Sequence, residues 1–264
     1  MCPMSTGGDD RVPAIRAAMG TNWAHARIHV FDELESTSQW LADHLPDAPT
    51  LVIADRQTRG RGRQGREWAS PPGGLYLSAG LPATSTQSIR PALSLLVGLQ
   101  LAEVLRAEGF AGIQLKWPND LVVHGAKLAG LLVERLPHAL IIGVGINVEG
   151  SGIDDLPADR QAIGLHQLSD RPVDDELLGA LARGVFDATA WSPTQSDWLL
   201  RERWPAFDIL TGRDIVVEQA GGATLTGRVA GITASGELRL ITETGERHLQ
   251  AGECRIQGGW ASTP

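Results

Sequence analysis

The residues of this chain that are best suited to bind an anion stand together in one short segment, residues 56–66. The segment reads Arg-Gln-Thr-Arg-Gly-Arg-Gly-Arg-Gln-Gly-Arg, so it holds five arginines, three glycines and no acidic residue. Glycine lets backbone N–H groups approach a ligand closely, and guanidinium groups bind phosphate or carboxylate oxygens two at a time. Because the whole chain carries a net charge of −8, the segment predicts a local anion site and not a general nucleic-acid surface.

Two other interpretations of this segment are less well supported. Gly60 to Gly65 fits the dinucleotide-binding pattern G-x-G-x-x-G, but that motif needs a helix at the glycines and an acidic residue about 20 positions later. Here Pro71-Pro72-Gly73-Gly74 follows, and no Asp or Glu occurs between Glu67 and Glu103. A flexible, RNA-binding Arg-Gly segment would be a longer low-complexity stretch, whereas this copy is single and short.

Lysine is rare in this chain, and that makes its two lysines informative. Of the 23 basic residues only Lys116 and Lys127 are lysine, and all the others are arginine. An ammonium group is a compact point charge, whereas a guanidinium group is a planar fork. We interpret Lys116 and Lys127 as candidate positions where a point charge is needed, with chance survival on a surface as the alternative.

The elements that must position these residues follow from the hydrophobic pattern. The strands predicted are one that begins at Arg27 and those at 51–55, 75–81, 113–117, 121–123, 128–133 and 140–148. The helices predicted are 12–19, one that follows Ser36-Thr37-Ser38, 88–108, 174–189 and 194–204. The basic segment is therefore expected to be a loop between two strands. The hydroxyls of residues 36–38 can cap a helix or form the polar lip of a pocket, and both interpretations stay open.

The pattern changes after Pro205. Four short β segments are predicted there, at 214–218, 224–232, 237–242 and 246–249, with turns at 221–222, 235–236 and 244–245. They indicate a small β barrel or sandwich. We therefore expect an N-terminal tail and short helix at 1–26, a catalytic domain at 27–205 and a small β-barrel domain at 206–264.

Composition excludes several classes of protein. A chain of 264 residues with 42% hydrophobic residues can bury a sizeable core. Cys2 and Cys254 are too few and too far apart to indicate a disulfide framework or a zinc site. The start of the chain has no signal-peptide pattern, and no apolar run reaches the 18 residues of a membrane helix, so we expect a cytoplasmic protein without membrane contact.

Five segments, in this order, resemble the motifs of the biotin protein ligases. They are Glu-Ser-Thr-Ser at 35–38, Gln57-x-x-Gly-Arg-Gly-Arg-Gln-Gly-Arg-x-Trp68, Lys116-Trp-Pro-Asn-Asp120, Lys127-Leu-Ala-Gly130 and Gly143-Val-Gly-Ile-Asn147. Together with the C-terminal β segments, the resemblance covers about residues 27–258. It implies an α+β fold, in which a mixed sheet with helices, as in class II aminoacyl-tRNA synthetases and biotin ligases, is followed by a small SH3-like β barrel.

The resemblance also implies roles for individual residues, with Lys127 and Arg63 as catalytic residues. Those implied to bind biotin are Ser36, Thr37, Ser38, Gln57, Gly60, Arg61, Gly62, Arg63, Lys127, Gly130 and Gly143. Those implied to bind ATP or the adenylate are Arg61, Arg63, Trp68, Asn119, Lys127 and Asn147, with Gly252 and Glu253 as a weaker correspondence. Ser38 departs from the family, which usually has Asn at this position.

The activity implied is that of an ATP-dependent ligase. It would activate biotin as biotinyl-5'-AMP, with ATP and Mg²⁺, and would then transfer biotin to a lysine of a biotin carboxyl carrier protein of acetyl-CoA carboxylase or a similar enzyme. The residues agree, because this reaction brings two anions together and is promoted by fixed positive charge. A protein nucleophile is not needed, and neither Gly-x-Ser-x-Gly nor His-Glu-x-x-His occurs in the sequence.

Two alternatives remain open at this stage. Lipoate and octanoate ligases resemble the same catalytic fold, although the Gly-Arg-Gly-Arg loop and Lys-Trp-Pro-Asn-Asp favour biotin. A non-enzymatic, biotin-responsive regulator is the other alternative. Only about 26 residues precede the first predicted strand, too few for a DNA-binding domain with its own core, so we expect a monofunctional ligase that does not bind DNA. We expect a monomer or a weak homodimer.

Overall fold

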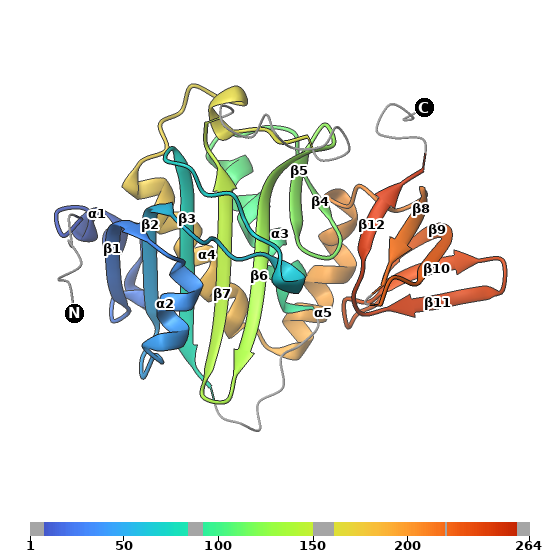
Figure 1. Ribbon diagram of the computed structural model, residues 1–264, viewed down its shortest axis with the longest axis horizontal. Coiled ribbons are helices and arrows are strands. Elements are labelled where there is room, and N and C mark those ends of the chain that lie inside the picture. The colour runs from blue at the N-terminus through green and yellow to red at the C-terminus, as the bar shows by residue number, and fades with distance from the viewer. Residues whose placement is uncertain (1–7, 84–91, 150–160, 220, 258–264) are drawn as a thin grey trace.

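The computed structural model describes residues 8–83, 92–149, 161–219 and 221–257, and a seven-stranded sheet forms its centre (Figure 1). The strand order is β1-β2-β3-β7-β6-β5-β4; β1 and β2 run parallel and every other neighbouring pair runs antiparallel. The strands are β1 (Arg27–Leu34), β2 (Thr50–Gln57), β3 (Gly74–Pro82), β4 (Ile113–Lys116), β5 (Asp120–Val123), β6 (Ala126–Leu136) and β7 (Ala139–Asn147).

Helices cover both faces of this sheet. They are α1 (Val12–Met19), α2 (Thr37–Asp43), α3 (Leu93–Ala107), α4 (Asp175–Ala190) and α5 (Pro193–Glu202). The α2 helix packs on one face in a small cluster around Leu41, whereas α1, α3 and α4 contribute to the main core (Figure 1). Side-chain caps define three of these helices, because Ser36, Asp174 and Ser192 each accept a hydrogen bond from the backbone N–H three residues later.

The N-terminal helix is part of the packed structure. Ile15 and Met19 on α1 are fully buried. Arg11, just before the helix, forms ion pairs with Asp55 (2.8 Å) and Asp175 (2.9 Å). The helix packs against α4 so closely that a Cβ added at Gly179 would stand 2.4 Å from the carbonyl oxygen of Ile15. The short helix predicted over 12–19 is therefore confirmed, and it contributes to the core.

A second, antiparallel sheet follows in the C-terminal part of the chain. Its strand order is β11-β10-β9-β8-β12, and all four neighbouring pairs run antiparallel. The strands are β8 (Asp214–Glu218), β9 (Thr224–Ile232), β10 (Leu238–Thr242), β11 (Gly245–Leu249) and β12 (Glu253–Ile256). In Figure 1 this sheet lies at the opposite end of the molecule from α1. Its buried residues belong to the same hydrophobic cluster as the main core.

These elements confirm the predicted fold class. Apart from shifts of one or two residues at several ends, they differ from the predicted segments in three places. The helix predicted over 88–108 is α3 from Leu93 onward, and residues 88–91 lie outside the described residues. Strand β6 extends to Leu136, three residues past the predicted end. Strand β12 was not predicted, because Cys254 and Ile256 alternate with charged residues over only four positions. No helix in the described part of the chain is both long and apolar enough to cross a membrane.

Candidate active site

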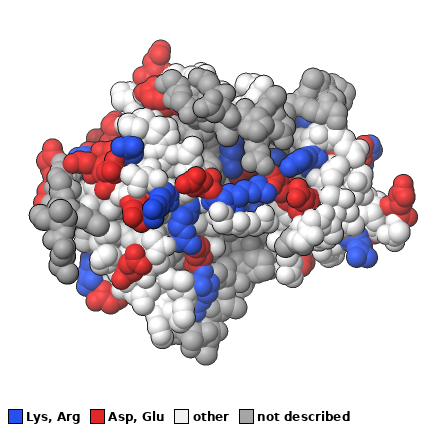
Figure 2. Space-filling model, viewed as in Figure 1, with Lys and Arg blue, Asp and Glu red and all other residues white. Residues whose placement is uncertain are grey.

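A cavity of about 860 Å³ lies between the basic segment, strands β6 and β7, and strand β12 of the second sheet. Figure 2 shows basic side chains gathered in a band across the middle of this face, with acidic side chains beside them. The cavity walls include almost every residue that the sequence assigned to the site; Gly60 is the exception. The lining residues that carry the chemistry are Ser36, Thr37, Ser38, Gln57, Arg61, Gly62, Arg63, Trp68, Asn119, Lys127, Gly130, Gly143 and Asn147.

The basic segment folds back on itself as a small hairpin. The N–H of Gly62 donates to the carbonyl of Arg66 (2.8 Å), and the N–H of Trp68 donates to the carbonyl of Gly60 (2.9 Å). Gly60 leaves no room for a side chain, because a Cβ there would stand 2.3 Å from the carbonyl oxygen of Trp68. The chain then enters strand β3 and not an α-helix, so the segment is not a dinucleotide-binding motif.

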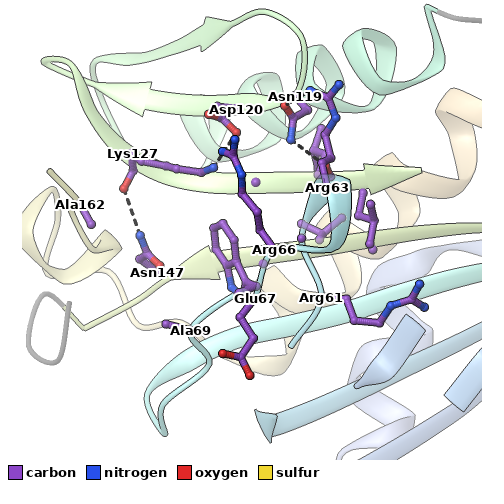
Figure 3. A pocket seen from close by; sticks show the side chains of 18 of the residues that line it. Arg61, Arg63, Arg66, Glu67, Ala69, Asn119, Asp120, Lys127, Asn147 and Ala162 are labelled. Carbon is purple, nitrogen blue, oxygen red and sulfur yellow. Dashed lines mark hydrogen bonds and ion pairs between the residues drawn. The ribbon is translucent and has the colours of Figure 1, made fainter. Parts of the chain in front are cut away.

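The arginines of the segment point in different directions, as Figure 3 shows for three of them. Arg63 lies in the cavity, where it donates a hydrogen bond to Asn119 Oδ1 (3.0 Å) and where burial lowers the pKa of its guanidinium group. Arg66 pairs with Glu253 of β12 (2.5 Å). Arg61 lines the cavity, but its guanidinium group pairs with Glu134 (2.6 Å), further along β6. The structure thus places Arg63, more than Arg61, among the other polar residues of the cavity.

One end of the cavity holds neutral hydrogen-bonding groups. The backbone N–H of Thr37 donates to Gln57 Oε1 (2.8 Å), and the Thr37 hydroxyl lies 2.7 Å from the hydroxyl of Ser78. The hydroxyls of Ser36 and Ser38 are 3.1 Å apart. Ser36 also caps α2, so the capping role and the pocket role left open by the sequence are combined in one residue. This end can bind a small, uncharged polar group.

The other end of the cavity holds a cation. Lys127 Nζ forms an ion pair with Asp120 Oδ1 (2.8 Å) and lies 5.0 Å from the centre of the Trp68 ring (Figure 3). Asn147 donates a hydrogen bond from Nδ2 to the Lys127 carbonyl (3.0 Å), which fixes the backbone of β6 at this point. Lys116, the other lysine of the chain, lines the same cavity. With Arg63 these ammonium groups provide the positive charge that a carboxylate and a phosphate need in order to approach each other.

Trp68 forms part of the cavity wall between these two ends. A Cβ at Gly130 would stand 2.7 Å from Cζ3 of its ring, and a Cβ at Gly145 would stand 2.5 Å from its Nε1. These two glycines let the indole lie directly on the sheet. At Gly143, by contrast, an added Cβ would make ordinary contacts, the nearest at 3.6 Å to the Ser78 hydroxyl, so close packing against Trp68 does not require this glycine. Within the described residues the buried Nε1 of Trp68 has no hydrogen-bond partner.

The sequence did not assign roles to several residues that line the cavity. Ser78 completes the neutral cluster, and its only sequence signal was a hydroxyl within an otherwise apolar strand. Tyr76 donates its hydroxyl to the Pro71 carbonyl (2.8 Å), and burial raises the pKa of this tyrosine to about 12. Burial likewise raises the pKa of the Cys254 thiol to about 12, so that this group stays protonated at neutral pH and is a poor nucleophile. Asp120 was recognised within a motif but was given no role.

Two family models match this chain. The model described as the Biotin/lipoate A/B protein ligase family matches residues 30–147, and the one described as the Biotin protein ligase C terminal domain matches residues 211–256. The fold and the site together therefore define a protein ligase of the biotin and lipoate class.

Individual relatives show to which members of this class the chain is similar. The chain is 31% identical over 244 residues to the biotin–acetyl-CoA-carboxylase ligase of Paracoccus denitrificans, a match that spans 85% of this chain and 100% of the relative. It is 31% identical over 238 residues to the bifunctional ligase/repressor BirA of Escherichia coli, with 87% of this chain and 74% of the relative covered. The biotin protein ligase from Aquifex aeolicus in complex with biotin and ATP is similar in structure, with a TM-score of 0.74 and 27% identity over 88% of this chain and 98% of that one. The chain belongs to the biotin protein ligases.

The contact between Trp68 and the sheet gives a first prediction. We expect Gly145→Ala to weaken binding of biotinyl-5'-AMP by about tenfold, because the added methyl group would push the indole into the cavity and overpack it. Isothermal titration calorimetry with a non-hydrolysable analogue of the adenylate measures this. Gly98→Ala on α3 is the matched control, because the Cβ there makes an ordinary contact at 3.4 Å. Equal affinities of both variants would show that the indole position does not matter.

Proposed function

We propose that this cavity holds biotin with its ureido ring at the neutral end and its carboxylate toward Lys127 and Arg63. The observation that carries the proposal is the separation of chemistry within one cavity: hydroxyl and amide groups at one end, fixed cations at the other. The ureido ring offers uncharged N–H donors and a carbonyl acceptor, which the side chains of Thr37, Ser36 and Gln57 can satisfy. Ser38, whose hydroxyl lies against Ser36, offers a donor or acceptor in place of the usual Asn.

The first step joins the biotin carboxylate to the α-phosphate of ATP, with release of diphosphate. Lys127 is placed to lie between the carboxylate and the phosphate, where one point charge stabilises both. Arg63 is held by Asn119 and adds a second cation to the same region. Because Lys127 stands on strand β6 and is held by its pair with Asp120, this cation needs little reorganisation when negative charge builds up on the phosphate.

Mg²⁺ enters this proposal with ATP, whose phosphates bind it. Among the residues that the structure describes, no group of three or more His, Cys, Asp or Glu side chains could hold a metal ion. Asp120 lines the cavity and fits as a carboxylate that a phosphate-bound Mg²⁺ can share. The ion would neutralise charge on the phosphates when ATP is bound.

The second step transfers biotin from AMP to a lysine amine of an acceptor protein. The names of the relatives support the carrier domain of an acetyl-CoA carboxylase as that acceptor. The protein contributes position and charge to this step and not a nucleophile, which agrees with the protonated thiol of Cys254. The need for ATP and for this acceptor supports the cytoplasm as the site of action.

ATP-dependent attachment of labelled biotin to a purified carrier domain tests the proposal. We expect label to appear on the carrier only when ATP is present, with one AMP released for each biotin attached. A carrier whose acceptor lysine is replaced by arginine is the control, and lipoic acid in place of biotin tests the related acyl group. Transfer of lipoate in preference to biotin, or label that appears without ATP, would overturn the assignment.

A further inference from the structure

Trp117 lies between the cavity and the C-terminal sheet, and the C-terminal sheet holds its side chain. The indole is 2% exposed, and its Nε1 donates a hydrogen bond to the carbonyl of Gly236 (3.0 Å), in the turn between β9 and β10. On another side of the ring, a Cβ added at Gly252 would stand 3.8 Å from Cζ3. This buried donor thus has its partner 119 residues further along the chain.

The backbone of Trp117 leads directly into the turn that carries partners of both catalytic cations. Asn119 accepts the hydrogen bond from Arg63 (3.0 Å), and Asp120 forms the ion pair with Lys127 (2.8 Å). The turn is held to its surroundings at two further points. Ser94 of α3 donates to the Pro118 carbonyl (3.1 Å), and Leu131 of β6 donates to the Asn119 carbonyl (3.0 Å).

The C-terminal part of the chain is also attached to the strand just before this turn. The N–H of Leu115 donates to the Phe207 carbonyl (2.8 Å), and the N–H of Ile209 donates to the Leu115 carbonyl (3.0 Å). These bonds fix strand β4, two residues before Trp117. The indole, which donates to Gly236, fixes the chain at Trp117 itself, the residue next to the turn.

We propose that Trp117 is a positioning residue for adenylate formation. Its hydrogen bond to Gly236 ties the turn at 118–120 to the C-terminal sheet. This turn then orients Arg63 through Asn119, and Lys127 through Asp120. The C-terminal sheet therefore influences the reaction at the carboxylate and α-phosphate through a buried side chain, in addition to any group it presents to the ligand. This inference rests on the proposed roles of Lys127 and Arg63.

The first test compares two tryptophans. Trp117→Phe keeps an aromatic ring but removes the N–H donor, and we expect the single-turnover rate of biotinyl-AMP formation to fall about tenfold. Biotin affinity should stay within about twofold, because the neutral end of the cavity does not contact this turn. Trp204→Phe is the matched control: Trp204 is also 2% exposed, and within the described residues its Nε1 has no hydrogen-bond partner. It removes the same atoms without breaking a hydrogen bond, so its adenylation rate should stay within about twofold.

The second test changes the acceptor of the same hydrogen bond, the carbonyl of Gly236. Gly236 has φ +85°, and a Cβ there would stand 2.8 Å from Cα of Ala92, so Gly236→Ala must displace the turn and its carbonyl. We expect the same slow adenylation, and we expect the double variant to be no slower than the slower single variant. Gly245→Ala controls for backbone strain alone, because Gly245 has φ +115° at the start of β11 with open space around an added Cβ.

The results separate this inference from the proposed function. Absence of biotinyl-AMP with the unaltered protein would count against the proposed function itself. Normal adenylation by Trp117→Phe, or a loss no greater than that of Trp204→Phe, would overturn the positioning role. Parallel losses of biotin affinity and adenylation, or independent effects of Trp117→Phe and Gly236→Ala in the double variant, would also overturn it. If Trp117→Phe does not fold, the Gly236→Ala and Gly245→Ala pair decides the question by the same adenylation assay.

Discussion

Replacing Lys127 with alanine is expected to slow the formation of biotinyl-AMP by about 10²–10³-fold, the loss typical when one fixed charge or donor is removed from a developing anion. The ammonium group lies in the cavity beside Asp120 and over the Trp68 ring. Without it, the carboxylate and the α-phosphate repel each other with one cation fewer between them. Single-turnover release of diphosphate in the presence of biotin measures the effect.

Lys127→Arg should recover little of this rate. The guanidinium group is larger and planar, and it cannot take the place of a point charge between two ligand groups. The fold should survive both substitutions, because the pair with Asp120 is partly exposed and such pairs contribute about 0–1 kcal/mol. Arg228→Ala is the control, since it removes an exposed cation from its partner Asp214 far along the chain. Near-normal turnover of Lys127→Arg would show that positive charge alone is sufficient.

Arg63→Gly is expected to make the enzyme leak its activated intermediate. Arg63 faces the cavity from the basic segment and is fixed by Asn119, so its loss removes an anion contact and opens the segment. We expect biotinyl-AMP to escape about tenfold faster and to label a bystander protein that carries no acceptor sequence. Arg59→Gly is the matched control, because it makes the same change in the same segment at a side chain that is 76% exposed.

The same segment is expected to become more ordered when its ligand binds. Five arginines repel one another when no anion is present, so we expect residues 58–66 to exchange amide hydrogens faster in the free protein than with biotin or biotinyl-AMP bound. Hydrogen exchange with mass spectrometry measures this difference. Unchanged protection on binding, or unchanged selectivity of Arg63→Gly, would leave the arginines as electrostatic attractors without a closing role.

The sequence predicted which residues of the short motifs would lie together. Lys127, Asn119 and Gln57 line the cavity as expected, because each stands within a motif whose local geometry is set by the strand or turn that carries it. The sequence did not separate Arg61 from Arg63. Their side chains lie two residues apart, and only the hairpin of the basic segment sends one toward Glu134 and the other toward Asn119.

Contacts between distant parts of the chain could not be predicted from the sequence. Ser78 reaches Thr37 across neighbouring elements, and Trp117 meets Gly236 across more than a hundred residues. Neither pairing leaves a periodic pattern in one strand or helix, because each depends on how the sheets and helices pack. The same is true of Gly145, where the Trp68 ring from the basic segment's hairpin leaves no room for a side chain.

The packing of α1 has a practical consequence for attaching this enzyme to a surface. Residues from Gly8 onward belong to the folded unit, since even a Cβ at Gly8 would stand 2.4 Å from a methyl carbon of Val30. A tag or linker therefore belongs ahead of Gly8, and trimming the chain back to the first strand would strip Ile15 and Met19 from the core. Because α1 and the C-terminal sheet lie at opposite ends of the molecule, a support anchored at the α1 end would hold the enzyme with its C-terminal end pointing into solution.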